Sequence, residues 1–397
     1  MPITPWRRQS TINGPCENDL YHHWVVRPEE RKAWCVDIPR RAIMPDTDNH
    51  HLLREVLQAE GAVLAALDDP TQALHFGDPL TEYRALVDAT GVVDFSRRTQ
   101  LELTGDDRAS FLHNMCTNEI RKLAAGTGCE AFLLDAHGRV LGHVFVFCGA
   151  NSLLLETVAG QAERIRAHLS KYLIREKVEL HDRGPDWAEL LIAGETSKEL
   201  LSRVMSRPAP AGLLEHCEAV LAGVAVSVRR VDLTLPGGFL VGCAAGDAAA
   251  LWRTVRDAGA TACGEQAAEM ARIEAGSPYY GRDISEKTLP QELARDARAI
   301  SFVKGCYIGQ ETVARIDALG HVNRTLCGVR FAGTQVPPAG EELRSGGQVV
   351  GEVTSAAWSP RLSAPLALAY LRRGASAPSM KLESRLGEAE VVPLPVV

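Results

Sequence analysis

The sequence lacks the features that mark membrane proteins and nucleic-acid-binding proteins. No apolar run in its 397 residues is long enough to cross a bilayer, and no cationic segment followed by an apolar one opens the chain. The 43 lysine and arginine residues are outnumbered by 50 aspartate and glutamate residues, which gives a net charge of −7. Such a chain has no overall basic field to attract nucleic acid or anionic lipid. We therefore expect no membrane partner and no specific nucleic-acid partner.

Paired cysteines are also absent. The ten cysteines form no Cys-x-x-Cys pair, and no group of cysteine and histidine residues has the spacing of a zinc finger. Scattered, unpaired cysteines are typical of reduced thiols in the cytoplasm, where disulfide bonds rarely persist. These observations predict a cytoplasmic protein without a metal site.

The first 50 residues lack the hydrophobic period that the rest of the chain shows. A segment without a periodic apolar face cannot bury enough surface to offset its conformational entropy. We predict that residues 1–50 form a disordered N-terminal extension. The folded chain should start with the helical pattern that begins at Leu52.

Residues 51–325 combine strand patterns with helix patterns. Leu101 and Leu103 alternate with polar residues, and Gly105-Asp106-Asp107 then predicts a helix start capped by aspartate. Residues 132–134 and 140–147, joined by the turn Asp135-Ala136-His137-Gly138, predict a β-hairpin. Strands that alternate with helices but are joined by hairpins favour mixed α+β layers, mostly antiparallel, over a doubly wound parallel sheet.

Short strand patterns dominate after Arg324. Apolar runs at 326–331, 348–353 and 366–371 are separated by turn-forming pairs such as Gly346-Gly347. Helical periodicity is scarce in this part of the chain. We therefore predict that residues 326–397 form a small β-barrel domain.

The string Lys304-Gly305-Cys306-Tyr307-Ile308-Gly309-Gln310-Glu311 is the most informative motif of the sequence. The pattern after it predicts a short amphipathic helix that ends at Gly320, a C-cap glycine. Cys306 then lies just upstream of a helix N-terminus, where the helix dipole favours an anion and lowers a thiol pKa. The dipole contributes only about 0.3–1 kcal/mol, so a thiolate would also need a nearby cation such as Lys304. A buried, unreactive Cys306 is the alternative reading.

These eight residues match the signature of YgfZ-type folate-binding proteins, which are relatives of the aminomethyltransferase (T-protein) of the glycine cleavage system. The resemblance continues through residues 272–284, 288–292, 351–356 and 359–360, and weaker similarity begins near Leu80. It implies an α+β fold of mixed, mostly antiparallel layers, arranged as a clover-leaf around a central folate cavity. The last part of the clover-leaf would be the C-terminal β-barrel, so the folate-binding region would span residues 51–325.

A folate site needs carboxylates or amides for the pterin edge, apolar walls for its ring and cations for its glutamate tail. The candidates are Asn118, Glu292, Tyr307, Gln310 and Glu311, with Tyr279 and Tyr280 as further walls, and all but Asn118 lie in the segment from Arg272 to Glu311. Each could instead be a surface or satisfied core residue. Likewise, Arg282 and Asp283 could form a local pair that stabilises a turn.

Several positions depart from the T-protein pattern. T-proteins carry a Gly-Gly-x-x-Asp-Asp hairpin with a catalytic aspartate, and the matching stretch here is Gly138-Arg139-Val140-Leu141-Gly142-His143. The glutamate that holds the pterin corresponds to Pro236, and an arginine expected to meet the folate tail corresponds to Ala268. His143 could replace the lost aspartate, or it could be a satisfied core histidine.

The resemblance implies a protein that binds tetrahydrofolate or a related reduced folate and supports assembly or repair of iron–sulfur clusters. Its partners would be iron–sulfur client enzymes or assembly proteins. Cys306 and Lys304 are the candidate catalytic residues, with Cys306 acting as a thiolate. The alternative is a tetrahydrofolate-dependent aminomethyltransferase or demethylase of the T-protein class. The sequence leaves open whether the protein is an enzyme.

Overall fold

The computed structural model describes residues 48–65 and 72–396, which belong to one structural unit. All but the last three residues of the predicted extension, 1–50, lie outside this part of the chain. Helix α1 (Asp48–Ala59) buries Leu53 and Leu57, in agreement with the helical pattern predicted there.

A five-stranded antiparallel sheet follows the order β5-β6-β7-β4-β8. Its strands, in that order, are Thr127–Leu134, Val140–Cys148, Leu153–Thr157, Thr99–Thr104 and Glu179–Asp182. Helices α3 (Arg108–Met115) and α4 (Ala162–Ser170) share one apolar core with this sheet. The predicted β5–β6 hairpin is confirmed. The predicted aspartate cap of α3 is wrong, because the Asp107 carboxylate accepts the backbone N–H of Lys177 at 2.9 Å instead.

A second sheet has six strands in the order β10-β11-β12-β9-β3-β13, of which only β3 and β13 pair in parallel. These strands are His216–Leu221, Val224–Val231, Gly238–Ala244, Trp187–Ala193, Gly91–Asp94 and Thr261–Ala262. Helices α1, α5 (Ser197–Val204) and α6 (Ala248–Asp257) contribute to the core on one face. Helices α2 (Pro79–Asp88) and α7 (Glu265–Ala275) contribute to a separate core.

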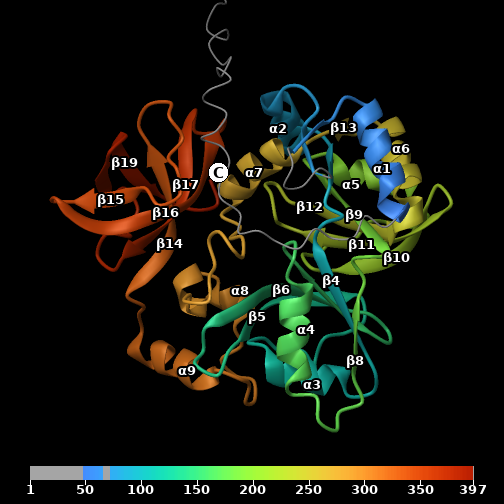
Figure 1. Ribbon diagram of the computed structural model, residues 1–397, viewed down its shortest axis with the longest axis horizontal. Helices are drawn as coiled ribbons and strands as arrows, with labels where there is room; N and C mark the ends of the chain where they lie inside the picture. The colour runs from blue at the N-terminus through green and yellow to red at the C-terminus, as the bar shows by residue number, and fades with distance from the viewer. Residues whose placement is uncertain (1–47, 66–71, 397) are drawn as a thin grey trace, which may run out of the picture. The chain divides into compact units, whose positions relative to one another are not determined.

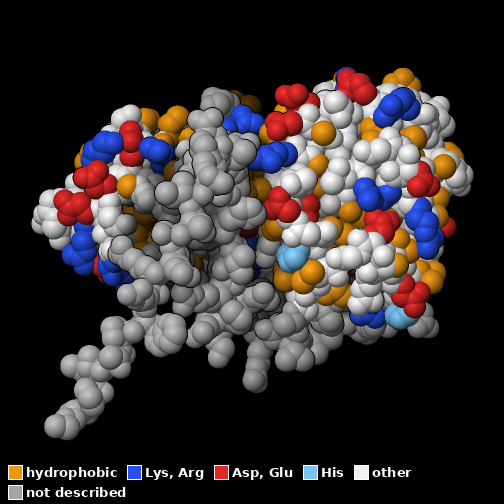
Figure 2. Space-filling view, turned by 90° about the horizontal axis from the view of Figure 1, so that it is seen from above, with side chains coloured by type: hydrophobic (Ala, Val, Ile, Leu, Met, Phe, Trp, Pro, Cys, Tyr) orange, Lys and Arg blue, Asp and Glu red, His pale blue; other side chains and the backbone are white. Residues whose placement is uncertain are grey.

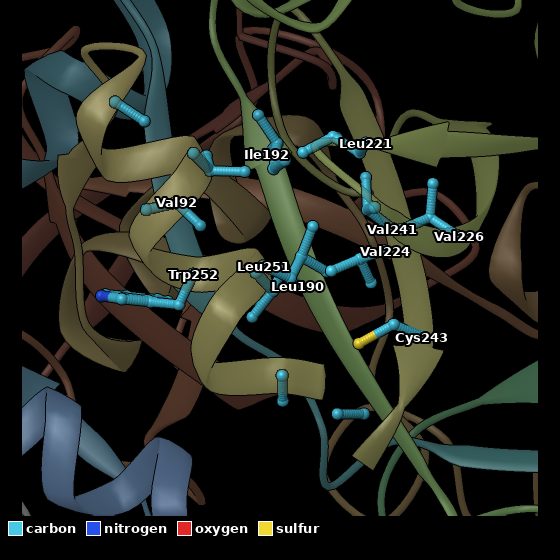
Figure 3. Packing of buried hydrophobic residues seen from close by; sticks show 14 of the residues in the cluster. Val92, Leu190, Ile192, Leu221, Val224, Val226, Val241, Cys243, Leu251 and Trp252 are labelled. Atoms are coloured by element: carbon cyan, nitrogen blue, oxygen red, sulfur yellow. The ribbon is translucent and has the colours of Figure 1, made fainter. Parts of the chain in front are cut away.

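In the first of these cores, alternating apolar residues of the strands pack against the apolar faces of the helices. Figure 3 shows Leu190 of β9 beside Leu251 of α6, in a cluster that also contains Ile192 and Trp252. Trp252 is fully buried. Burial of one large apolar side chain contributes about 1.5–3 kcal/mol, so this face fixes α6 on the sheet.

The C-terminal part is a closed barrel with the order β14-β17-β16-β15-β18-β19. Its strands are Arg324–Phe331, Ala364–Arg372, Gln348–Ser359, Glu342–Ser345, Lys381–Ser384 and Gly387–Val392. The predicted barrel and the predicted α+β class are therefore confirmed. The remaining elements are β1 (Val63–Leu64), β2 (Ala73–His75), η2 (Ala245–Asp247), η3 (Pro290–Leu293), α8 (Asp296–Ala299) and α9 (Gln310–Leu319).

Helix α7 lies between α2 and the barrel strands β16 and β17 (Figure 1). Arg272 of α7 forms an ion pair of 2.9 Å with the buried Asp283, whose other carboxylate oxygen accepts the Thr354 hydroxyl of β16 at 2.5 Å. The suggested local pair of Arg282 with Asp283 is wrong, because Arg282 instead pairs with Glu269 at 3.1 Å. Asp283 therefore connects α7 to the barrel.

Two glutamates and two arginines form a buried charge cluster where the two sheets meet. Arg229 of β11 lies 2.6 Å from Glu189 of β9 and 3.4 Å from Glu156 of β7. Arg98 pairs with Glu156 at 2.6 Å from the turn that precedes β4. Both glutamates and Arg229 are 0% exposed, so water does not screen their charges.

Burial, reinforced by the charge of Glu189, raises the pKa of Glu156 to about 8. Between about pH 4.5 and this value, the folded chain keeps a proton that the unfolded chain has released. The free energy of unfolding should therefore fall as pH rises through this window. Glu156→Gln, which stays neutral, should remove this part of the slope. Urea unfolding at pH 5 to 8 measures it, and the exposed Glu163→Gln is the control. Equal slopes for all three proteins would contradict the prediction.

Candidate functional site

A cavity opens where the two sheets meet helix α7. Its wall is formed by the β3–β4 turn, strand β6, the residues around the end of β7, the β11–β12 loop, α7 and the segment that follows α7. Segments far apart in the sequence thus contribute side chains to one space.

Apolar and aromatic side chains form part of this wall. They include Phe95, Phe145, Val158, Leu233 and Tyr279. The Tyr279 ring lies near two guanidinium groups, 5.0 Å from Arg282 and 5.9 Å from Arg272. A planar aromatic ligand could stack against such a wall.

Carboxylates and guanidinium groups line the same cavity. Burial raises the pKa of Asp94 and, together with the charge of Glu269, the pKa of Glu265. Burial would also raise the pKa of Glu269, but the ion pairs with Arg272 and Arg282 lower it. Arg97, Arg98 and Arg272 supply the positive charge. The cavity can therefore bind both hydrogen-bond donors and anionic groups.

Thr234 provides an observation that points to a ligand. Its side chain is 2% exposed, it lines the cavity, and its hydroxyl has no hydrogen-bond partner among the described residues. A buried hydroxyl without a partner costs about 1–3 kcal/mol. A bound molecule with a polar group at this point would remove that cost.

His143 also lines the cavity, and its ring is paired with a carboxylate. Its Nε2 lies 2.7 Å from Oε1 of Glu130, on the neighbouring strand β5. Burial lowers the pKa of His143, although Glu130 opposes this effect. Burial would raise the pKa of Glu130, but the hydrogen bond from His143 and the charge of Arg295 hold it far below its ordinary value. The pair therefore consists of a neutral imidazole and an ionised carboxylate at neutral pH.

Asn118, a predicted folate ligand, instead makes hydrogen bonds to the backbone beside this pair. Its side-chain N–H groups donate to the backbone carbonyls of Glu130 and Arg298, both at 2.8 Å. Arg298 in turn lies 3.0 Å from the Glu130 carboxylate and makes two hydrogen bonds to Asp232. Asn118 thus helps to place the charged groups that surround Glu130.

Lys304 is buried and donates to three backbone carbonyls. They belong to His113, Cys116 and Asn118, at 2.5, 2.8 and 2.6 Å. The structure therefore uses the ammonium group to close the end of helix α3. No hydrogen bond or ion pair joins Lys304 to Cys306 among the described residues.

The second glycine of the motif explains how the following helix is attached. Gly309 has φ 79°, and a Cβ placed on it would lie 2.6 Å from the Asp135 carbonyl oxygen in the β5–β6 turn. Only glycine fits this approach without strain. Thr312 adds a hydrogen bond of 2.9 Å to the His137 carbonyl. The motif therefore fixes the start of α9 on the hairpin.

The other predicted ligands lie in different surroundings. Tyr307 is buried beside Lys304, with 5.0 Å between Nζ and the ring centroid. Gln310 and Glu311 open α9 with half-buried and exposed side chains, and Glu292 binds Arg324 of the barrel at 3.0 and 3.1 Å. None of the seven predicted catalytic and folate-binding residues, all within the described residues, lines the cavity. Their catalytic and binding roles stay predictions.

Cys306 is exposed, unlike the other seven cysteines in the described part of the chain. Burial raises the pKa of each of those seven thiols. They therefore stay protonated and unreactive at neutral pH. Cys306 is the accessible thiol of this region, as a functional reading requires.

Two positions that depart from the T-protein pattern lie at the cavity. Ala268 and His143 both line it, and so do Leu233 and Thr234 just before Pro236. The sequence also carried a usable signal for the buried charged residues near the cavity, which the sequence analysis did not single out. Glu130, Glu156, Glu189 and Arg229 are charged residues inside apolar strands, which is uncommon unless they are paired.

Two absences apply to residues 48–65 and 72–396. No helix there is long and apolar enough to cross a membrane. No group of three or more histidine, cysteine, aspartate or glutamate side chains there could hold a metal ion.

The fold and the cavity define an α+β protein with a C-terminal barrel and a cavity of mixed polar and apolar lining at the junction of its sheets. Comparison with protein families matches residues 53–303 to the GCVT N-terminal domain and residues 324–397 to the glycine cleavage T-protein C-terminal barrel domain. The chain therefore belongs to the glycine cleavage T-protein family.

Individual relatives agree with this assignment. An aminomethyltransferase of Symbiobacterium thermophilum is 30% identical over 343 residues, which are 81% of this chain and 90% of the relative. An aminomethyltransferase of Nostoc sp. is 29% identical over 307 residues, 75% and 81% of the two chains. The crystal structure of glycine cleavage system aminomethyltransferase T from Bartonella henselae superposes with a TM-score of 0.80. It shares 21% identity over 87% of this chain and 97% of that one, which shows the same fold.

Proposed function

We propose that the protein binds a reduced folate in the cavity and acts as a tetrahydrofolate-dependent one-carbon transferase or demethylase of the T-protein class. The observation that carries this proposal is a single cavity with aromatic walls, carboxylates on α7 and arginines on the β3–β4 turn. Relatives that match most of the chain are named aminomethyltransferases, which supports it.

The residues of the cavity suit the three parts of a folate. Glu265, whose pKa is raised by burial of its carboxyl group, is the candidate ligand of the pterin edge. It would replace the pterin-binding glutamate of T-proteins, whose position Pro236 occupies in this chain. Phe95 and Tyr279 would flank the ring, and Arg97 would meet the glutamate tail. The unpartnered Thr234 hydroxyl would gain a partner from the same ligand. Tetrahydrofolate would supply the nitrogen that carries the one-carbon unit.

Glu265→Gln should bind tetrahydrofolate roughly 10- to 150-fold more weakly, since a hydrogen bond to a charged group contributes about 1.5–3 kcal/mol. Isothermal titration calorimetry measures the change. Gln266→Ala, at the next position of α7 and outside the cavity wall, is the matched control. Formation of methylenetetrahydrofolate from an aminomethylated carrier protein tests transfer directly. Wild-type protein that fails to bind reduced folates would overturn the proposal.

A second candidate function is support of iron–sulfur cluster assembly or repair in the cytoplasm by a YgfZ-type folate-binding protein. The exposure of Cys306 favours it, because a thiol must be accessible to attack a substrate or to hold iron or sulfur transiently. Lys304, Tyr307 and Gly309 would then position the loop that presents Cys306 to iron–sulfur client enzymes or assembly proteins. Deletion of the gene separates the two candidates. Loss of [4Fe–4S] enzyme activity with normal one-carbon transfer would favour the second.

A further inference from the structure

The second ring nitrogen of His143 is the feature that the proposed function leaves unused. Nε2 is bound to Glu130, whereas Nδ1 has no protein partner among the described residues, although the side chain is only 8% exposed and lines the cavity. The rings of Phe132 and Phe145 lie 5.2 and 5.5 Å from the imidazole. These contacts hold the ring in place.

Glu130 determines which nitrogen carries the proton. Its carboxylate stays ionised because it also accepts Nη2 of Arg295 at 2.9 Å and lies 3.0 Å from Nε of Arg298. An ionised carboxylate accepts hydrogen bonds only, so Nε2 of His143 must be the donor. The neutral imidazole then has its lone pair on Nδ1, the nitrogen that is left for the cavity.

We propose that Nδ1 of His143 is the proton acceptor of this cavity and binds an N–H or O–H group of the reacting ligand. When that group reacts, its N–H or O–H bond breaks, the electron pair stays on the ligand atom, and the proton forms an Nδ1–H bond. Glu130 stabilises the resulting imidazolium through the hydrogen bond to Nε2. The inference deepens the proposed function. It rests on that function for the identity of the ligand, a folate or an amine co-substrate.

This arrangement also restricts the ligand. A carboxylate at this point would set its lone pairs against the lone pair of Nδ1, so the site selects an amine or a hydroxyl. Glu130 on β5 and Arg295 and Arg298 around α8 are the charged groups that act on the imidazole. Two positive charges and burial oppose its protonation, and Glu130 supports it, so the imidazole is neutral before it takes the proton.

The ¹⁵N resonances of the imidazole test the inference without turnover. In the free protein at pH 7, His143 should show the Nε2–H tautomer, and addition of tetrahydrofolate, alone or with sarcosine, should shift the Nδ1 resonance. His216 is the internal control, because its Nε2 lies 2.9 Å from the Cys148 carbonyl and its ring packs on Phe147, as His143 packs on Phe145. An Nδ1–H tautomer, or folate and sarcosine binding without a shift at Nδ1, would overturn the inference.

Substitutions give the second arm of the test. His143→Leu should lower the transfer rate at least roughly 100-fold, the lower end of general acid–base contributions, and should flatten the pH–rate profile. His143→Asn, which keeps a polar atom near the position of Nδ1, should retain most of the folate affinity but lose the same rate. His216→Asn should change neither quantity. A normal transfer rate in His143→Leu would overturn the inference. Absence of folate binding in the wild-type protein would instead overturn the proposed function. The tautomer of His143 in the free protein would then still decide whether Glu130 directs the lone pair to Nδ1.

Discussion

Replacing Arg229 by leucine is expected to lower the free energy of unfolding by about 3–5 kcal/mol, the usual cost of removing one partner from a buried ion cluster. The substitution leaves Glu156 and Glu189 close together, both 0% exposed, with only Arg98 to offset them. Because Glu156 belongs to one sheet and Glu189 to the other, the loss of Arg229 leaves the buried Glu189 carboxylate at the junction of the two sheets without its 2.6 Å partner. Urea unfolding followed by tryptophan fluorescence measures the loss.

The neighbouring residue is the matched control for this experiment. Arg230 is half-buried on the same strand, and one of its N–H groups donates to the Gly238 carbonyl at 3.2 Å. Arg230→Leu should cost about 1 kcal/mol, the net value of one hydrogen bond. The double variant Arg229→Leu, Glu189→Leu should recover part of the lost stability, since it removes one charge of each sign. Equal effects of Arg229→Leu and Arg230→Leu would show that the cluster does not stabilise the junction.

Replacing Cys306 by serine should leave the fold intact and, if the second candidate function holds, abolish complementation of iron–sulfur enzyme activity in a deletion strain. The side chain is exposed, so we expect a stability change within about 0.5 kcal/mol. A serine hydroxyl stays protonated at neutral pH and is a poor ligand for iron or sulfur. The loss would therefore be chemical. Melting curves of the purified variant test the first half, and complementation tests the second.

Cys148→Ser and Cys217→Ser are the controls, because both thiols are half-buried and have a raised pKa. Maleimide labelling followed by peptide mass spectrometry should find Cys306 modified fastest among the cysteines of the described residues. Full complementation by Cys306→Ser would rule out a role for this thiol and leave the one-carbon transferase as the remaining candidate. Its transfer assay does not depend on Cys306.

The fold could be predicted because its information is local. The apolar period of 140–147 and the turn before it define the β5–β6 hairpin, and the short runs after Arg324 define barrel strands. These patterns reflect which side chains must leave water, and neighbours in the sequence decide that. The aspartate cap of α3 failed because Lys177, 70 residues away from Asp107, offers the carboxylate another donor.

The candidate site could be predicted only in part. The motif from Lys304 to Glu311 has the residue types of a reactive site, yet its lysine binds backbone carbonyls and its second glycine fits a close approach to the hairpin. Residue chemistry alone cannot separate a functional lysine from one that closes a helix end. The surface charges show the same limit. On the face seen in Figure 2, the described positive and negative side chains are interspersed, so they mark no site.

The sequence by itself determined the α+β class, the barrel and the positions where this chain departs from the T-protein pattern. The tertiary structure alone decided what those positions contact. Glu130 and His143 pair across two strands, and Arg295 and Arg298 keep Glu130 ionised from 165 and 168 positions further along the chain. Thr234 lines the cavity beside His143 from the loop between β11 and β12. The physical reason is that pKa values, hydrogen-bond partners and cavity walls depend on distances between side chains, which folding sets between segments remote in sequence.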